Sequence, residues 1–181
     1  MNPKQLIDNA FRLLAGKFYL RNCSRVGIRP RVYGHPRITN LGRIDIGDRF
    51  IMFNQTVRSE MVAHPEGWID IGDRVFLNYG ASLSAHRLVR IGAGCQIGSY
   101  VCMMDNDYHQ VEDRSRPGES SPIVLEKNVW LGVRVIVLKG VRIGENAVVG
   151  AGSVVTGDIP PDVFAAGVPA RVIRRFGKEG R

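Results

Sequence analysis

The hydrophobic positions of this chain recur every six residues along its C-terminal half. From Leu125 onward an aliphatic residue stands at every sixth position, and the residue four places after each is small or β-branched. The first set is Leu125, Leu131, Val137, Ile143, Val149 and Val155, and the second set is Val129, Val135, Val141, Ala147, Ser153 and Ile159. This period is neither the 3.6 residues of a helix nor the simple alternation of a half-buried strand.

Earlier stretches follow the same rule, with slips near residues 56–68 and 84–90 that predict short loops. The earlier copies are Ile46–Phe50, Ile71–Val75, Leu77–Ala81, Ile91–Cys95 and Ile97–Val101. A period of six is typical of a parallel β-helix, in which three hexads form one triangular coil of about 18 residues. We therefore expect an all-β solenoid in which the lead and fifth residues point inward. Glycine after the lead residue relieves crowding where the chain turns.

Two other architectures that bury aliphatic residues do not fit the pattern. A doubly wound parallel sheet needs helices between its strands, and residues 123–159 contain no helical pattern. A coiled coil needs heptads, which are absent from the hexad region. The hexads do not by themselves determine the hand of the coil.

The segments that flank the repeat predict different structures. Residues 3–20 carry Ile7, Phe11, Leu14 and Phe18 at helical spacing, which predicts an amphipathic helix. This helix would cap the open first coil or, alternatively, lie on a membrane surface. We divide the chain into an N-terminal helix and basic linker (1–30), a β-helix domain (31–162) and a C-terminal tail (163–181).

Charge is concentrated at the two ends of the chain. The 181 residues carry a net charge of +8; residues 1–44 hold nine Lys or Arg against one Asp, whereas residues 45–162 hold eleven against fifteen Asp or Glu. Basic ends attract phosphates, nucleic acid or anionic lipid, but no nucleic-acid-binding motif accompanies them. We therefore expect no nucleic-acid partner.

The expected location is the cytoplasm. No apolar run approaches the roughly 18 residues needed to span a bilayer, and the three scattered cysteines predict reduced, structural thiols. The basic N-terminus leaves peripheral association with the inner membrane surface open.

The repeat stops at the stretch MMDNDYHQ, residues 103–110. His109 falls on the frame 91, 97, 103, 109, where an inward aliphatic residue is due. The next residues, QVEDRSRPGESSP at 110–122, are polar and contain two prolines, which predicts a loop protruding from the coil. His109 is thus expected at the root of this loop, together with Asp105 and Asp107.

Several motifs then make the sequence similar to the hexapeptide-repeat acyltransferases, in particular the O-acetyltransferases of sugars and bacterial surface polysaccharides. The motifs are VFLNYG (75–80), DNDYH (105–109), NVWLG (128–132), VRIGENAVVGAGSVVT (141–156) and AAGVPAR (165–171). The resemblance covers about residues 44–175. It implies a left-handed coil, acetyl-CoA as co-substrate, a saccharide acceptor and a homotrimer whose acyl-CoA channel lies between neighbouring subunits.

The resemblance also implies roles for polar residues. His109 would act as general base on the acceptor hydroxyl, because a hydroxyl is scarcely ionised at neutral pH and an imidazole can take its proton. Asp105 or Asp107 would orient that imidazole or bind acceptor hydroxyls, and the sequence does not choose between these roles. Asn78 matches an acceptor-site asparagine, and His86 and Arg87 are weaker candidates for the acceptor cleft.

A third group of residues matches the acyl-CoA site of this family. Small residues let the pantetheine arm lie close to backbone amides, and arginine suits the phosphates because its planar donors fork onto two oxygens. The candidates are Trp130, Gly132, Val133, Gly150, Ala151, Thr156, Arg171 and Arg174. One position departs from many relatives, since Gly157 stands where they carry lysine.

Three other functions are compatible with parts of the pattern to different degrees. A metal-dependent hydratase of the γ-carbonic anhydrase type needs three histidines converging on zinc, and only His64, His86 and His109 could gather, without the usual five-residue spacing. No metal is therefore expected. A non-catalytic binding or scaffolding solenoid remains compatible with the fold, and N-acetylation of an amino sugar would use the same base. Neither the acceptor nor the acyl chain follows from the sequence.

Overall fold

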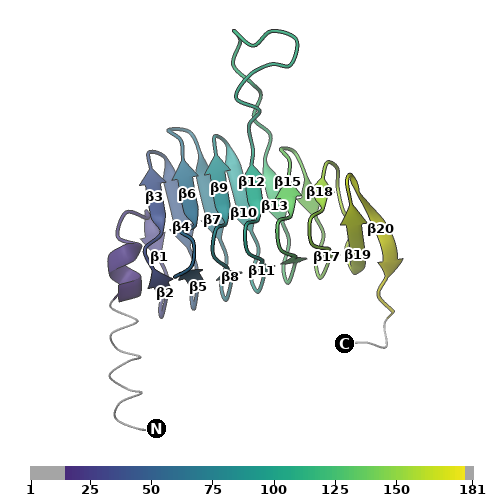
Figure 1. Cartoon of the computed structure of the whole chain (residues 1–181). Helices are drawn as coiled ribbons and strands as arrows, with labels where there is room; N and C mark the ends of the chain where they lie inside the picture. The colour runs from purple at the N-terminus through teal and green to yellow at the C-terminus, as the bar shows by residue number, and fades with distance from the viewer. Residues whose placement is uncertain (1–14, 178–181) are drawn as a thin grey trace.

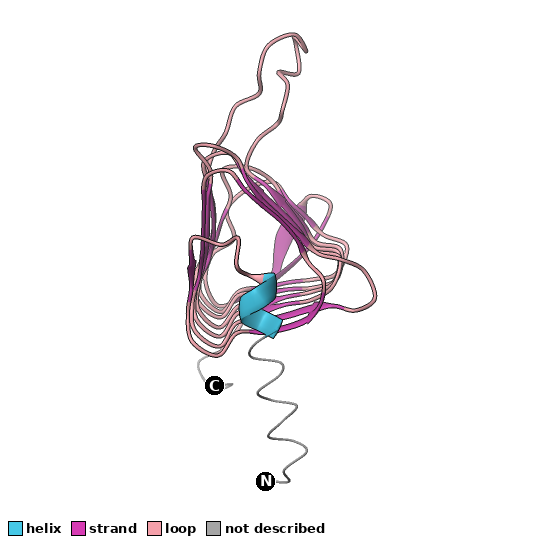
Figure 2. Ribbon diagram, turned by 90° about the vertical axis from the view of Figure 1, so that its left-hand side faces the viewer, coloured by secondary structure: helices cyan, strands magenta, loops and turns pink. Residues whose placement is uncertain are grey.

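The chain folds into a three-sided prism of stacked coils from which one long loop protrudes (Figures 1 and 2). The computed structural model describes residues 15–177. Each coil contributes one strand to each of three sheets, and the strands of neighbouring coils pair in parallel. The prediction of an all-β solenoid is confirmed.

The first sheet, called sheet A, has six strands: β1 (Arg25–Val26), β4 (Arg43–Ile46), β7 (Trp68–Ile71), β10 (Leu88–Ile91), β13 (Ile123–Leu125) and β16 (Arg142–Ile143). Sheet C also has six: β3 (Arg37–Asn40), β6 (Glu60–Ala63), β9 (Ser82–Ala85), β12 (Cys102–Met104), β15 (Ile136–Val137) and β18 (Val154–Val155).

Sheet B has eight strands and ends in a hairpin. Its members are β2 (Arg31–Gly34), β5 (Ile51–Asn54), β8 (Phe76–Leu77), β11 (Gln96–Ile97), β14 (Trp130–Leu131), β17 (Val148–Val149), β19 (Val163–Gly167) and β20 (Ala170–Arg175). β19 still pairs in parallel with β17, and only β20 runs antiparallel to its neighbour. The C-terminal tail thus extends the solenoid by one strand before it folds back.

The core consists of the residues that the hexad frame places inside. All twelve lead and fifth residues between Leu125 and Ile159 are buried, and so are those of the earlier copies. Because Leu125, Ile143 and their equivalents in sheet A are stacked in register, each apolar side chain packs on the same kind of side chain in the coils before and after it. The predicted inward set is confirmed.

Two other hexad positions have separate backbone tasks. Glycine after the lead residue is needed for close approach, because a Cβ on Gly72 would lie 2.7 Å from the backbone nitrogen of Ala93 in the next coil. The turn itself uses the residue two places later, which has positive φ at Arg74, Asn128 and Asn146. A left-handed residue there lets the chain turn the corner of the prism.

Both ends of the described chain lie against the outer coils. Residues 15–19 are helical, in agreement with the expected N-terminal helix, and residues 3–14 of that expectation lie outside the described residues. Figure 2 shows this helix in front of the open end of the prism, and Leu20 directly after it is buried in the core. Strand pairing begins already at Arg25, inside the expected linker. No helix among residues 15–177 has the length and apolar character needed to cross a membrane.

Candidate active site

The long loop leaves the prism at the corner between sheets C and A, here called the loop corner (Figure 2). It begins at Asp105 directly after β12 and returns to β13 at Ile123. Its two arms run antiparallel at isolated bridges from Asn106 to Ser120 and from His109 to Pro117. The predicted loop is confirmed, and it starts earlier than residue 110.

His109 is exposed in this loop, and its ring is oriented by the backbone. Nδ1 lies 3.0 Å from the carbonyl oxygen of Arg114. Since a carbonyl oxygen can only accept a hydrogen bond, Nδ1 carries the proton of the neutral ring. Nε2 then has a free lone pair, which is the form of imidazole that can accept a proton from a substrate.

Asp105 has a different environment from the one expected of an acceptor-binding residue. Its side chain is 0% exposed, and its two carboxylate oxygens accept backbone N–H groups of His86, Arg87 and Leu88 at 2.6–2.7 Å. These donors belong to the loop corner of the preceding coil. Asp105 therefore anchors the root of the loop rather than facing the His109 ring.

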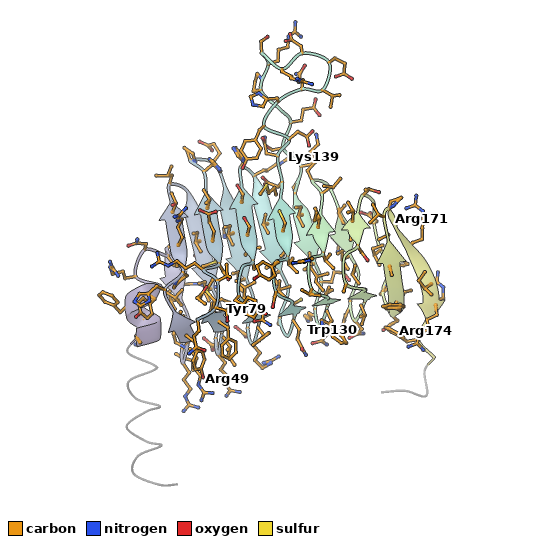
Figure 3. All side chains as sticks on the ribbon, in the orientation of Figure 1. Arg49, Tyr79, Trp130, Lys139, Arg171 and Arg174 are labelled. Atoms are coloured by element: carbon orange, nitrogen blue, oxygen red, sulfur yellow. The ribbon has the colours of Figure 1, made fainter. Side chains whose placement is uncertain are left out.

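Asp107 is also engaged in holding the loop. Its carboxylate lies 2.7 Å from Nζ of Lys139, which stands at the loop corner of the following coil and also lies 3.8 Å from Glu119 on the returning arm. These contacts raise the pKa of Lys139, chiefly through its hydrogen bond to Asp107. Figure 3 shows Lys139 at the base of the loop.

His86 lies beneath the loop, whereas Arg87 beside it is exposed. The His86 ring stacks on His64 of the preceding coil with centroids 3.6 Å apart, and Tyr108 from the loop meets it edge-on at 5.3 Å. The hydroxyl of Ser84 contacts both His64 and Tyr108. Sequence reasoning did not single out Lys139, Tyr108 or Ser84, whose residue types carry no signal without the coil register.

A second set of predicted residues gathers at the corner between sheets B and C, here called the cofactor corner. Asn78, Gly132 and Gly150 each follow a strand of sheet B, and their backbone N–H groups donate to the next coil at 2.8–2.9 Å. Val133 and Ala151 lie beside them, and a Cβ on Gly132 would lie 2.7 Å from the nitrogen of Ala151. The backbones of neighbouring coils therefore approach each other closely at this corner.

The remaining cofactor candidates lie outside this corner, in three different parts of the prism. Trp130 is 53% exposed on the outer face of sheet B, and Arg171 and Arg174 are exposed on β20 (Figure 3). Ser153 connects the cofactor corner to the end of β19, because its hydroxyl donates to the carbonyl of Gly150 and accepts from the N–H of Gly167. Thr156 instead follows β18 and lies at the loop corner.

The two corners lie at opposite ends of the strands of sheet C. The path from Ala81 at the cofactor corner to His86 at the loop corner has five steps, or roughly 16 Å in an extended strand. One copy of the chain therefore does not bring His109 to Asn78 or to Gly132. A site that uses both sets needs the loop of one copy to approach the cofactor corner of another.

Asn78 lines a pocket of about 300 Å³ on the outside of sheet B. The other lining residues are Phe53, Gln55, Thr56, Phe76 and Tyr79. The side-chain oxygen of Asn78 accepts the N–H of Tyr79 at 2.9 Å, which leaves its NH₂ group as the donor for a ligand.

Metal-ligand and thiol chemistry find little support in the arrangement of side chains. Among residues 15–177 no three His, Cys, Asp or Glu side chains are grouped so that they could hold a metal ion. Burial raises the pKa of the Cys23 thiol to about 12 and that of Cys95 to about 11. Such thiols are poor nucleophiles.

Comparison with known proteins gives consistent matches. The family model for the bacterial transferase hexapeptide (six repeats) matches residues 122–157. The chain is 35% identical over 179 residues to WbbJ of Escherichia coli (strain K12), whose name assigns it to O-acetyl transfer in lipopolysaccharide biosynthesis; the match covers 92% of this chain and 86% of that protein.

Two further matches cover sugar acetylation and coenzyme binding. The galactoside O-acetyltransferase of E. coli (strain K12) is 42% identical over 110 residues, covering 60% of this chain and 54% of that protein, so the match spans about half of this relative. A hexapeptide-repeat acetyltransferase of Vibrio cholerae O1 biovar eltor, solved with acetyl coenzyme A, has a TM-score of 0.64 at 25% identity and covers 97% and 89% of the two chains.

Proposed function

Since the chain belongs to the hexapeptide-repeat acetyltransferases, whose left-handed β-helix its fold matches, we propose that it transfers an acetyl group from acetyl-CoA to a hydroxyl group of a saccharide. The relatives that it resembles are named for O-acetylation of galactosides and for lipopolysaccharide biosynthesis. The observation that carries the proposal is the 3.0 Å contact between Nδ1 of His109 and the carbonyl oxygen of Arg114, from which we infer that Nδ1 donates and Nε2 is the accepting atom.

The reaction follows from that lone pair. Nε2 of His109 accepts the proton of the acceptor hydroxyl while the oxygen of that hydroxyl attacks the carbonyl carbon of the thioester. The bond between carbon and sulfur then breaks, and the imidazolium returns the proton to the departing thiolate of CoA. A thiolate is a good leaving group, so neither a metal nor a covalent enzyme intermediate is needed. General base catalysis of this kind contributes roughly 10²–10⁴-fold.

The active site is proposed to lie between subunits. Asn78 would bind the acceptor, while Trp130, Gly132, Val133, Gly150 and Ala151 would line the path of the pantetheine arm and Arg171 and Arg174 would meet the phosphates of CoA. These groups lie roughly 16 Å along sheet C from the root of the loop. A neighbouring copy that places its loop over the cofactor corner would complete the site, as expected for a homotrimer.

The test is acetyl-CoA turnover with and without an acceptor. Release of the CoA thiol should be accelerated by a sugar from a panel of simple glycosides, nucleoside diphosphate sugars, isolated glycans and one amino sugar. With that sugar, His109→Ala should lower kcat about 10²–10⁴-fold while its circular dichroism stays that of the parent.

His35→Ala is the control, since His35 is an exposed histidine hydrogen-bonded to Tyr19; it lies between β2 and β3 in the first coil, and it does not line the Asn78 pocket. It should keep kcat. An undiminished kcat in His109→Ala would remove the mechanism, and acetylation of the amino sugar alone would replace O-transfer by N-transfer.

A further inference from the structure

A basic cleft lies at the third corner of the prism, between sheets A and B. It has a volume of about 310 Å³ and is lined by Arg29, Arg31, Arg49, Arg74 and Ile51. Figure 3 shows Arg49 projecting outward from the N-terminal coils, away from the loop. The residues assigned above to His109 chemistry and to CoA lie at the other two corners, on the terminal hairpin or, for Trp130, on the outer face of sheet B.

The stacking of coils brings these arginines together. The N–H of Arg49 donates to the carbonyl of Ile28, and the N–H of Arg74 donates to that of Asp48. Arg29, Arg49 and Arg74 therefore occupy the same place in three successive coils. Arg31 stands beside Ile51 in the register of sheet B and closes one side of the cleft.

The backbone at this place disfavours arginine. Arg29, Arg49 and Arg74 have φ values of 56°, 56° and 55°, a left-handed conformation that is costly for most side chains. The following coils put Gly94, Asn128 and Asn146 at the same place, and these residue types tolerate that conformation best. Fold stability therefore does not account for three arginines here.

Within the described part of the chain, no carboxylate forms an ion pair with the cleft arginines. Between described residues, the ion pairs of arginine involve Arg37, Arg43, Arg90, Arg116 and Arg142, and none of the four cleft arginines. Asp48 and Asp73 are the neighbouring acids, and each accepts a backbone N–H at the corner at 2.8 Å. Guanidinium groups gathered around one cleft suit a bound phosphate, which they bind through forked hydrogen bonds.

The cleft adjoins the pocket that contains Asn78. Ile51 lies in the cleft, pairs in register with Phe76 of the pocket, and is two residues before Phe53 on the same strand. Four steps separate Arg74 from Asn78, roughly 13 Å of extended chain. The outer face of sheet B is thus basic at one end, while the Asn78 pocket at the other end offers aromatic rings and side-chain amides.

We propose that the arginine cleft binds a phosphate or diphosphate group carried by the saccharide acceptor, whose sugar occupies the pocket at Asn78. This assignment rests on the proposed O-acetyltransferase function and narrows its substrate to phosphorylated saccharides. A nucleoside diphosphate sugar and a lipid diphosphate sugar share the chemistry that the cleft recognises.

The anion site is tested by binding, without turnover. The double variant Arg49→Asn and Arg74→Asn gives the corner the residue type of later coils, so it should fold at least as well as the parent. Calorimetry with inorganic pyrophosphate should show binding to the parent that weakens at least about tenfold in the double variant.

The matched control is Arg134→Asn, an exposed arginine with φ 58° at the cofactor corner. It should bind pyrophosphate like the parent. Equal pyrophosphate affinity in the parent and the double variant would overturn the site.

The acceptor assignment is tested by kinetics with two acceptors that share one sugar. For a nucleoside diphosphate sugar the double variant should raise KM at least about tenfold with little change in kcat, whereas KM for the methyl glycoside should stay unchanged. Equal shifts with both acceptors would overturn the assignment.

Failure of the two proposals can be told apart. If the parent acetylates no acceptor, the proposed function fails while pyrophosphate binding still reports on the cleft. Arginine-dependent binding to phosphatidylglycerol vesicles, combined with no binding of pyrophosphate or of nucleoside diphosphate sugars, would overturn the acceptor assignment in favour of a membrane surface.

Discussion

At the residue scale, His86 shows how the register of the coils sets the chemistry of one side chain. Its ring stacks on His64 and forms a T-shaped contact with Tyr108, and its Nδ1 is 3.9 Å from the buried carboxylate of Asp105. Burial lowers the pKa of His86, repulsion from His64 lowers it further, and Asp105 acts in the opposite direction. The folded protein therefore favours the neutral ring.

This lowered pKa predicts a loss of stability on acidification. As the pH falls below about 6.5, the unfolded chain gains a proton that folded His86 resists, so the free energy of unfolding decreases until the pH reaches the folded pKa. His86→Gln should lose less stability than the parent between about pH 7.5 and 5.5, measured by urea unfolding. His35→Gln should keep the parent's full loss, and a parent-like loss in His86→Gln would contradict this account.

The residue roles differ in how far the hexad frame could predict them. Arg49 and Arg74 each stand three places after a lead isoleucine, so the frame assigns both to one corner of the prism. Arg29 lies where the hexads can no longer be recognised in the sequence. Its position next to Arg49 is therefore apparent only in the structure. The anchoring role of Asp105 depends on backbone donors at His86 to Leu88, which no side-chain pattern marks.

At the element scale, the loop of residues 105–122 is fixed to the coils on both sides of it. Asp105 binds the backbone of the preceding coil, and Lys139 of the following coil reaches both arms through Asp107 and Glu119. The carboxylate of Asp105 is inaccessible to water, whereas that of Asp107 is about half exposed. The two contacts should therefore differ widely in their contribution to stability.

Asp105→Ala should lower the free energy of unfolding by about 3 kcal/mol or more, because three backbone N–H groups lose a buried acceptor at once. Asp107→Ala is the matched control, and its exposed ion pair should be worth less than about 1 kcal/mol. Chemical denaturation of the two variants and the parent gives both values. Similar losses in the two variants would show that the buried hydrogen bonds do not hold the loop.

Strands and loops could be predicted where the pattern of side chains determines them. The strands from Ile123 to Val155 follow from lead residues spaced six apart, and the loop follows from two prolines and a run of polar residues. β1 fell in the predicted linker (1–30) because no glycine-marked hexad covers residues 25–30. β1 forms because its backbone groups pair with the next coil, as when the N–H of Ser24 donates to the carbonyl of Ile44.

At the scale of the whole molecule, the prism separates the proposed catalytic base, His109, from the cofactor corner. Sheet C lies between them, and its six strands are paired in order from β3 to β18. The sequence resemblance predicted a shared site between subunits, and the geometry of one copy supplies an independent reason for it.

A shared site predicts that two inactive variants can rescue each other. His109→Ala removes the base from its own loop, and Asn78→Ala removes the acceptor contact from its own corner. In a mixed oligomer, a site that combines the loop of an Asn78→Ala subunit with the corner of a His109→Ala subunit has both groups intact. Random assembly of equal amounts should therefore restore about a quarter of the parental activity.

The measurement is CoA release by co-expressed and co-purified variants. Co-expression of His109→Ala with His109→Gln serves as the control, since no arrangement of those subunits restores an imidazole. If each site is built within one subunit, the first mixture should be as inactive as its components. Recovery in the first mixture and not in the control would show that His109 and Asn78 of one active site belong to different subunits. This is the arrangement that the separation across sheet C requires.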